Sequence, residues 1–225
     1  MKKGKLIVLE GTDCSGKETQ SNLLVDFLNS KGIKTKKFSF PFYDSPTGKI
    51  IAGAYLGKEG YMPPVFDEGA TNVDPYVASL LFAMDRKYNI HKILDELNNG
   101  TCVVLDRYID SNMAHQASKL EGAKQDEMID FLYNLEYNLL NLPNADIEVL
   151  LYMPTWASKI LKANRKEKPD QHEAKEDYLL KSENTYLKIA KERNIPILNC
   201  TDKERIKSII EISNELCSMI YNQLI

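Results

Sequence analysis

Short apolar runs alternate with longer stretches of helical period along the chain. The apolar runs lack the two-residue alternation of a strand with one exposed face, as expected for strands that are buried on both faces. This pattern predicts an α/β fold, with a five-stranded parallel sheet flanked by helices on both faces. Ligands of such sheets bind at the carboxyl ends of the strands. The expected strands are residues 5–10, 36–40, 101–106, 147–153 and 195–200.

The helical stretches have recognisable ends. Asp74 and Pro75 form a good N-cap and first-turn pair, and the helix that they open should stop before Gly100. Further helices are expected after Lys124, at about 174–193 and from 203 to the C-terminus. The polar run at about 163–177 has too little apolar content to pack, which predicts a short mobile lid.

Length and charge narrow the possible functions. The 225 residues contain no low-complexity linker and no internal repeat, so one domain spanning 1–225 is expected. A net charge of -3 leaves no cationic excess for coating nucleic acid. No apolar run reaches membrane length, and the cysteines lack C-x-x-C spacing, so a cytoplasmic protein without a membrane partner is expected.

The stretch EGTDCSGKETQ at 10–20 predicts a phosphate-binding loop, because its glycines and lysine have the G-x-x-x-x-G-K spacing between a strand and a helix. In such loops, backbone N–H groups cradle the phosphates of ATP and the lysine reaches them. A glycine turn without a ligand is the alternative interpretation. The residues expected to bind ATP are Gly11, Thr12, Asp13, Cys14, Ser15, Gly16, Lys17, Glu18 and Thr19.

Glu18 occupies the position where a serine or threonine hydroxyl usually faces Mg²⁺. The hydroxyl comes one residue later here, at Thr19, in a G-K-x-T-Q pattern similar to that of the adenylate kinase family. The carboxylate of Glu18 either points outward as a first-turn acid or reaches Mg²⁺ through water, and the sequence does not choose between these alternatives.

The third expected strand ends in VVLDRYIDSN. A carboxylate at Asp106 would be costly at the end of a buried strand unless it bound Mg²⁺ or hydrogen-bonded the phosphate loop. The guanidinium of Arg107 suits two-point binding of a phosphate. We therefore expect Asp106 to be a metal ligand and Arg107 to be catalytic, with a structural Asp-Arg ion pair as the alternative.

These motifs, together with FPFYDSPTGKI, LLFAMDR and LDRYIDSNMAHQA, resemble the thymidylate kinase family over most of the chain, from Lys5 to about Lys188. The resemblance implies a P-loop NTPase fold that transfers the γ-phosphate of ATP to dTMP. It also implies Mg²⁺ as a cofactor and a homodimer formed through helices.

The resemblance also implies the base-binding part of an acceptor site for dTMP. Phe82 would stack on the thymine ring, and Arg86 would bond the carbonyl edge of the base. These two residues are four apart and share one face of a helix, so both can reach the same base. Asn112 would read the pyrimidine edge. A core aromatic residue is the alternative interpretation of Phe82.

For the rest of the acceptor, the resemblance implies that Asp13 approaches the sugar and phosphate, that Arg107 binds the phosphate, and that His115 lines the sugar pocket. Many members of the family have an arginine for the acceptor phosphate where this chain has Phe42. We expect Lys49 to supply that charge instead, or to be a solvated lysine on a helix.

A second departure lies in the phosphate loop, where some members of the family carry an arginine and this chain has Cys14. The chain has five arginines, and Arg165 is the one in the expected lid. We therefore expect Arg165 to stabilise the transition state from the lid, together with Lys17 and Arg107.

Two other functions stay open at this point. A deoxynucleoside kinase would need a general base for a sugar hydroxyl, such as Glu10 at the first strand end, but its Asp-Arg-Ser motif reads Asp-Arg-Tyr here. A catalytically silent nucleotide-binding regulator would keep the phosphate loop without turnover.

Overall fold

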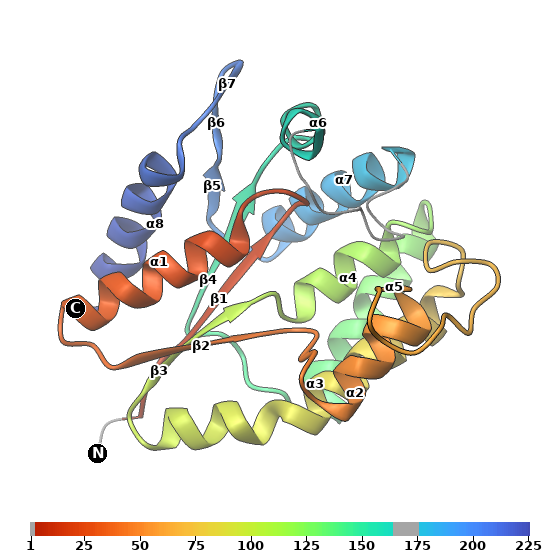
Figure 1. The fold of residues 1–225 in the computed structure, drawn as a ribbon, viewed down its shortest axis with the longest axis horizontal. Coiled ribbons are helices and arrows are strands. Elements are labelled where there is room, and N and C mark those ends of the chain that lie inside the picture. Colours follow the sequence, from red (N-terminus) through yellow and green to blue (C-terminus); the bar gives the residue numbers. More distant parts are fainter. Residues whose placement is uncertain (1–2, 164–175) are drawn as a thin grey trace.

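The computed structural model describes residues 3–163 and 176–225. Its main sheet has five parallel strands in the order β2-β3-β1-β4-β5, which confirms the predicted α/β architecture (Figure 1). Each predicted strand is present, with ends shifted by no more than two residues or so. The strands are β1 (Leu6–Gly11), β2 (Thr35–Ser39), β3 (Cys102–Asp106), β4 (Ile147–Tyr152) and β5 (Ile197–Asn199).

Helices cover both faces of this sheet (Figure 1). The helices are α1 (Lys17–Ser30), α2 (Pro46–Ile50), α3 (Pro75–Asn98), α4 (Ile109–Ala117), α5 (Ala123–Tyr133), α6 (Thr155–Ala163), α7 (Glu176–Glu192) and α8 (Ile209–Leu224). Two π-helical stretches, η1 (Ile51–Tyr55) and η2 (Asn134–Leu139), continue α2 and α5. The sequence analysis did not predict α2, η1, α4 or α6.

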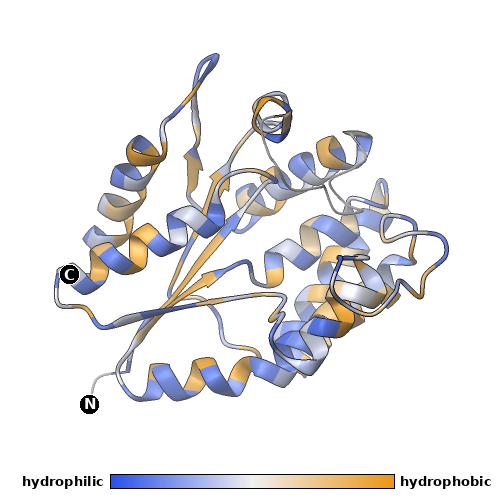
Figure 2. Ribbon diagram, in the orientation of Figure 1, coloured by the Kyte–Doolittle hydropathy of each residue, from blue (hydrophilic) through white to orange (hydrophobic). Residues whose placement is uncertain are grey.

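Two hydrophobic clusters lie on opposite faces of the sheet, because alternate residues of a strand face opposite sides, and a third lies around η1. Leu6 and Val8 of β1 pack toward α3, α4, α5 and α7. Ile7 and Leu9 of the same strand pack toward α1 and α8. Figure 2 shows apolar colour along the central strands, while the surrounding helices carry both apolar and polar faces. The sheet is therefore buried on both sides, as its continuous apolar runs indicated.

The long helix α3 begins as the sequence predicts. The side chain of Asp74 accepts hydrogen bonds from the N–H groups of Tyr76 at 2.9 Å and Val77 at 3.1 Å, and Pro75 occupies the first turn. These contacts satisfy two N–H groups that would otherwise lack a partner inside the helix.

The predicted start of the last helix at 203 is wrong. Residues in this region form a small antiparallel pair, β6 (Thr201–Asp202) with β7 (Arg205–Ile206). Helix α8 starts after Ser208, whose side chain and that of Glu211 form a capping box. The S-x-x-E spacing was visible in the sequence and would have located this start.

The predicted lid at about 163–177 falls mostly outside the described residues. Helix α6 ends at its first residue and α7 covers its last two. Within the described part of the chain, no helix is long and apolar enough to cross a membrane.

Candidate active site

The phosphate loop connects β1 to α1 in a conformation that needs its two glycines. A Cβ atom on Gly11 would lie 2.5 Å from Oγ of Ser15 and 2.7 Å from the carbonyl oxygen of Leu151 on β4. Gly16 has φ +76°, a left-handed conformation that glycine adopts without strain. The close contacts at Gly11 and the left-handed backbone at Gly16 therefore explain why glycine occupies both positions of the loop.

Lys17 folds back over this loop. Its Nζ donates hydrogen bonds to the carbonyl oxygens of Gly11 and Thr12, both at 2.9 Å, and to Oγ of Ser15 at 3.3 Å. Burial, with the nearby charge of Arg107, lowers the pKa of Lys17 to about 8. The ammonium group is thus held at the loop by these carbonyl groups.

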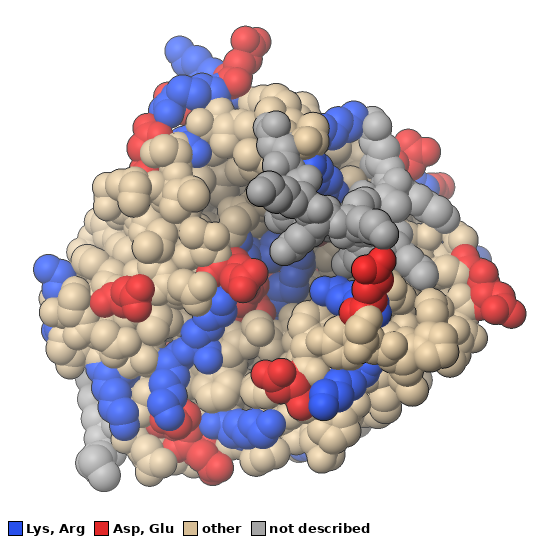
Figure 3. Space-filling model, in the orientation of Figure 1, with Lys and Arg blue, Asp and Glu red and all other residues tan. Residues whose placement is uncertain are grey.

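A cavity of about 360 Å³ opens beside the loop, at the carboxyl ends of β1, β2 and β3. Figure 3 shows a hollow near the middle of this face, with basic side chains at its bottom and acidic ones beside them. Six of the predicted ATP-binding residues line it: Asp13, Cys14, Gly16, Lys17, Glu18 and Thr19. The other three, Gly11, Thr12 and Ser15, are buried and are not part of the lining.

The carboxylate of Glu10 holds the turn after β3. It accepts hydrogen bonds from the N–H groups of Tyr108 at 2.7 Å and Ser111 at 3.1 Å, and from Oγ of Ser111. Burial raises the pKa of Glu10 above its usual value, although these bonds act in the opposite direction. Arg107 lies in this turn with φ +68°, a strained backbone that the contacts of Glu10 hold in place.

The guanidinium of Arg107 points from this turn into the cavity. It lies 3.4 Å from Oδ1 of Asp13 and 3.3 Å from the hydroxyl of Tyr186. Burial alone would raise the pKa of Asp13, but the nearby charges of His115 and Arg107 hold it well below its usual value. The second oxygen of Asp13 is buried and has no hydrogen-bond partner among the described residues. Arg107 and Asp13 therefore present one cation and one acceptor oxygen to a ligand.

Arg86 lies at the α3 side of the cavity, where Glu136 of η2 binds it through two hydrogen bonds. Both side chains are almost completely buried. Burial alone would lower the pKa of Arg86, but the carboxylate of Glu136 raises it. The alternative ion pair between Asp106 and Arg107 is not found among the described residues, where Arg107 pairs with Asp13.

Two amide side chains of α4 complete this end of the cavity. Nδ2 of Asn112 donates to Glu136 at 2.9 Å, while its Oδ1 is buried without a partner in the described structure. Both polar atoms of the Gln116 amide are likewise buried and unpaired. The ring of Phe82 lies in the same lining. Orphan donors and acceptors beside an aromatic ring are what a flat heterocyclic base with carbonyl and N–H groups would satisfy.

His115 lies between the cavity and α7. Its Nδ1 is 3.0 Å from the hydroxyl of Tyr178, and the two rings stack with 5.9 Å between centroids. Tyr186 contacts the same imidazole edge-on and donates its hydroxyl hydrogen to Oγ of Ser111 at 2.9 Å. The predicted sugar-pocket residue thus also joins α4 to α7.

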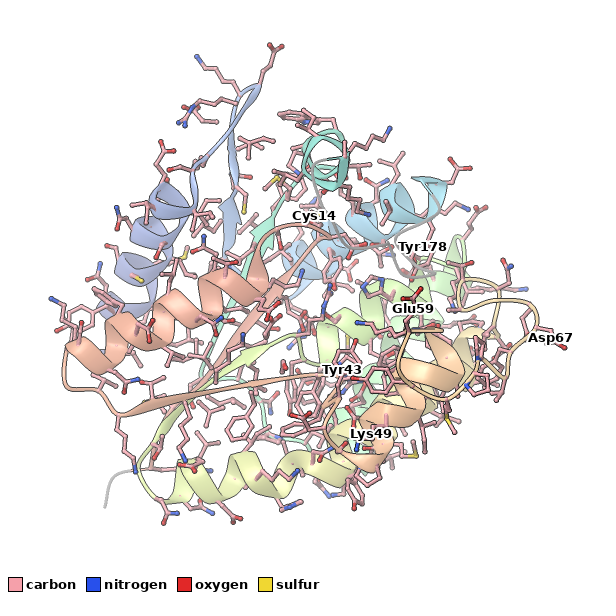
Figure 4. All side chains as sticks on the ribbon, in the orientation of Figure 1. Cys14, Tyr43, Lys49, Glu59, Asp67 and Tyr178 are labelled. Carbon is pink, nitrogen blue, oxygen red and sulfur yellow. The ribbon has the colours of Figure 1, made fainter. Side chains whose placement is uncertain are left out.

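The structure does not bring Phe42 or Lys49 into the cavity. Phe42 packs on Phe38 with 6.1 Å between ring centroids, and Nζ of Lys92 lies 4.2 Å above its ring. Lys49 is exposed on α2, and Figure 4 shows Tyr43 between it and Cys14 of the phosphate loop. Phe42 was expected among the dTMP-binding residues and Lys49 was expected to supply the charge for the acceptor phosphate. Neither belongs to the cavity lining, because Phe42 packs between Phe38 and Lys92 and Lys49 is exposed on α2.

Asp106 lies in the cavity lining at the end of β3, as predicted. No group of three or more histidine, cysteine, aspartate or glutamate side chains is arranged to hold a metal within the described residues. Arg165, the predicted lid cation, lies outside the described residues.

Sequence reasoning assigned no site role to eight residues of the cavity lining, nor to Glu136 beside it. The eight are Phe40, Pro41, Tyr43, Leu56, Lys58, Tyr108, Ser111 and Gln116. The sequence contained a signal for Gln116, because it directly follows the predicted site residue His115 in the motif LDRYIDSNMAHQA. Nothing local marked Glu136, which is 50 residues from Arg86.

A family model described as thymidylate kinase matches residues 9–210. A thymidylate kinase of Dictyostelium discoideum is 31% identical over 97% of this chain and 86% of that protein. A thymidylate kinase of Brachyspira hyodysenteriae is 32% identical over 71% of this chain and 69% of that protein. A solved structure of thymidylate kinase from Candida albicans superposes with a TM-score of 0.76 at 26% identity, over 98% of this chain and 92% of that one.

Proposed function

This chain belongs to the thymidylate kinase family, and from that premise we propose how its residues transfer the γ-phosphoryl group of ATP to dTMP. One observation carries the proposal. One cavity has the phosphate loop and Arg107 in its lining together with Phe82, Asn112 and Gln116, and the Oδ1 of Asn112 and both polar atoms of the Gln116 amide lack partners among the described residues. A nucleoside monophosphate has the matching polarity, with an anionic group at one end and a flat polar base at the other.

The reaction needs positioning and charge more than covalent participation of the protein. An oxygen of the acceptor phosphate attacks the γ-phosphorus, and the bond to the oxygen that bridges the β- and γ-phosphates breaks, which yields dTDP and ADP. Lys17 would hold the β- and γ-phosphates of ATP. Arg107 would hold the acceptor phosphate, because its guanidinium enters the cavity from the neighbouring strand end.

The donor set near Asp106 fits Mg²⁺. This carboxylate lines the cavity together with Glu18 and Thr19, and oxygen donors are the ligands that Mg²⁺ prefers. Since no complete protein cage is present among the described residues, phosphate and water oxygens would supply the other ligands. When bound with ATP, Mg²⁺ would neutralise charge on the transferred phosphoryl group.

The geometry disfavours a deoxynucleoside kinase. Such an enzyme needs a carboxylate free to take a proton from a sugar hydroxyl. Glu10, the candidate base, is outside the cavity lining and is occupied by the N–H groups at the start of α4. A silent regulator is disfavoured as well, because Lys17, Asp106 and Arg107 all line the cavity.

Coupled ADP release with a panel of acceptors tests this function. We expect turnover with dTMP to exceed turnover with AMP, GMP and CMP, since the amides of Asn112 and Gln116 suit a pyrimidine with two carbonyl groups. One methyl group is worth only about 1 to 3 kcal/mol, so dUMP should be used roughly 10- to 200-fold less efficiently. A purine nucleotide or CMP as the best acceptor would refute the proposal.

The role of Arg165 in stabilising the transition state remains a proposal from the sequence. An arginine that contacts only the transition state lowers kcat and kcat/KM together when it is removed. We expect Arg165→Ala to lower kcat by roughly 100- to 1000-fold with little change in ATP affinity, by analogy with other oriented charge donors. Wild-type kcat in this variant would exclude the role.

We also propose a homodimer that forms through an apolar groove beside α3. The groove is lined by Leu80, Ala83, Met84, Lys87, Tyr88, Leu135 and Leu140. Leu80 is 51% exposed and Tyr88 is 53% exposed, which is unusual for apolar side chains that share one helix face. The four cysteines are free thiols, in agreement with a cytoplasmic location.

A further inference from the structure

We propose that Lys58 binds the phosphate of the acceptor nucleotide, as a second cation beside Arg107. The inference rests on the proposed function, since it takes the acceptor to be a nucleoside monophosphate. Lys58 is half-buried and lies in the lining of the cavity that also contains Arg107 and Phe82.

Backbone hydrogen bonds fix the position of Lys58 just after the end of η1. Gly57 has φ +66°, a left-handed conformation that ends the helix, and its N–H donates to the carbonyl oxygen of Gly53 at 3.0 Å. The N–H of Lys58 donates to the carbonyl oxygen of Ala52 at 2.8 Å. The side chain therefore starts from a hydrogen-bonded position, in contrast to a lysine on an unattached loop.

The ring of Tyr43 holds the ammonium group of Lys58 within the cavity lining. Nζ of Lys58 lies 4.3 Å from the ring centroid of Tyr43, within the range of a cation–π contact. Tyr43 belongs to the loop after β2, and the N–H of Phe40 at the start of that loop donates to the carbonyl oxygen of Asp106 at 3.1 Å. Lys58 therefore approaches the same sheet edge as Arg107. Figure 4 shows Cys14, Tyr43 and Glu59, the neighbour of Lys58, coming from three separate segments around this region.

The charge of a phosphate dianion can be compared with the basic side chains of the lining. The lysines and arginines of the lining are Lys17, Lys58, Arg86 and Arg107. Arg86 is neutralised by Glu136, and Lys17 bonds the carbonyl groups of the ATP loop. Arg107 lies 3.4 Å from the carboxylate of Asp13, so it cannot balance a phosphate dianion by itself. A lysine suits a second contact with the phosphate, because it is a compact charge on a flexible stem.

Binding of dTMP and of thymidine, measured by calorimetry on wild type and Lys58→Ala, tests the assignment. The two ligands share base and sugar and differ in the phosphate. We expect Lys58→Ala to weaken dTMP binding by roughly 10- to 100-fold, the usual range for a hydrogen bond between charged groups, and to leave thymidine binding unchanged. Lys58→Arg should retain most of the dTMP affinity. Lys49→Ala is the matched control, since Lys49 is exposed and outside the cavity, and it should match wild type for both ligands.

Equal losses for dTMP and thymidine would overturn the assignment, because Lys58 would then support the base or the fold of the site. Unchanged dTMP binding in Lys58→Ala would overturn it as well. Failure of the proposed function is a separate result, namely that wild type neither binds nor phosphorylates dTMP.

Discussion

At the scale of single residues, burial makes the charge of Lys17 sensitive to pH. Its pKa is lowered to about 8, so free protein above that pH has lost the proton that a phosphate requires. Binding of ATP must then take up a proton. We expect the Kd for ATP to be nearly constant below pH 8 and to rise above it, approaching tenfold per pH unit.

Titration calorimetry with ATP between pH 7 and pH 10 measures this dependence. Lys17→Arg is the control, because arginine keeps its charge throughout that range. Its ATP affinity should be weaker but flat with pH. The same rise in both proteins would show that another group is titrating.

The pair of Arg86 and Glu136 is the second residue-scale feature, since both side chains are buried and each neutralises the other. Arg86→Ala leaves a buried carboxylate whose remaining partner is Asn112, at 2.9 Å. We expect this variant to lose about 3 to 5 kcal/mol of unfolding free energy, measured by urea denaturation.

The double variant Arg86→Met with Glu136→Leu should be more stable than Arg86→Ala, because it removes the uncompensated charge. Arg205→Ala is the exposed control: Arg205 also forms two hydrogen bonds with a glutamate, Glu211, but in solvent. A double variant no more stable than the single one would contradict the charge argument.

At the scale of elements, Glu183 of α7 holds the start of α6. Its carboxylate accepts hydrogen bonds from the N–H of Thr155 at 2.8 Å and from the hydroxyl of Tyr152 at 2.7 Å. Glu183→Ala leaves these donors without that acceptor. We expect a loss of about 1 to 3 kcal/mol in unfolding free energy and faster amide hydrogen exchange in α6.

Hydrogen exchange followed by mass spectrometry can compare α6 with α8 in this variant, and α8 should keep its protection. Lys181→Ala is a control on the same helix, because Lys181 forms an exposed ion pair with Glu121. Unchanged exchange in α6 would mean that α7 does not hold its N-terminus.

At the scale of the whole molecule, the apolar groove beside α3 predicts the oligomeric state. Sedimentation velocity should find wild type as a dimer at micromolar concentration. Leu80→Lys places a charge in the groove and should shift the protein toward monomer. Ile210→Lys is the control, since Ile210 is 62% exposed on α8 and outside the groove. A monomeric wild type, or a dimer that Leu80→Lys does not weaken, would contradict the proposal.

The sequence by itself determined the features that depend on neighbouring residues. Strands buried on both faces read as apolar runs, the Asp74-Pro75 pair marked the start of α3, and Gly11, Gly16 and Lys17 marked the phosphate loop. Such signals are local because a turn, a cap or a strand constrains only a few consecutive residues. The resemblance to a family predicted acceptor residues on α3 and α4 in the same way, through short motifs.

Tertiary structure alone decided which side chains meet. Glu136 binds Arg86 from 50 residues away, and Glu10 holds the turn around Tyr108 from 98 residues away. Lys58 lines the cavity while Lys49 does not, although both are lysines of the same segment. The difference arises because η1 and Gly57 set the direction in which the chain leaves α2, and that direction depends on packing across the molecule. A pattern of residue types cannot specify such contacts, since they join positions that are neighbours only after folding.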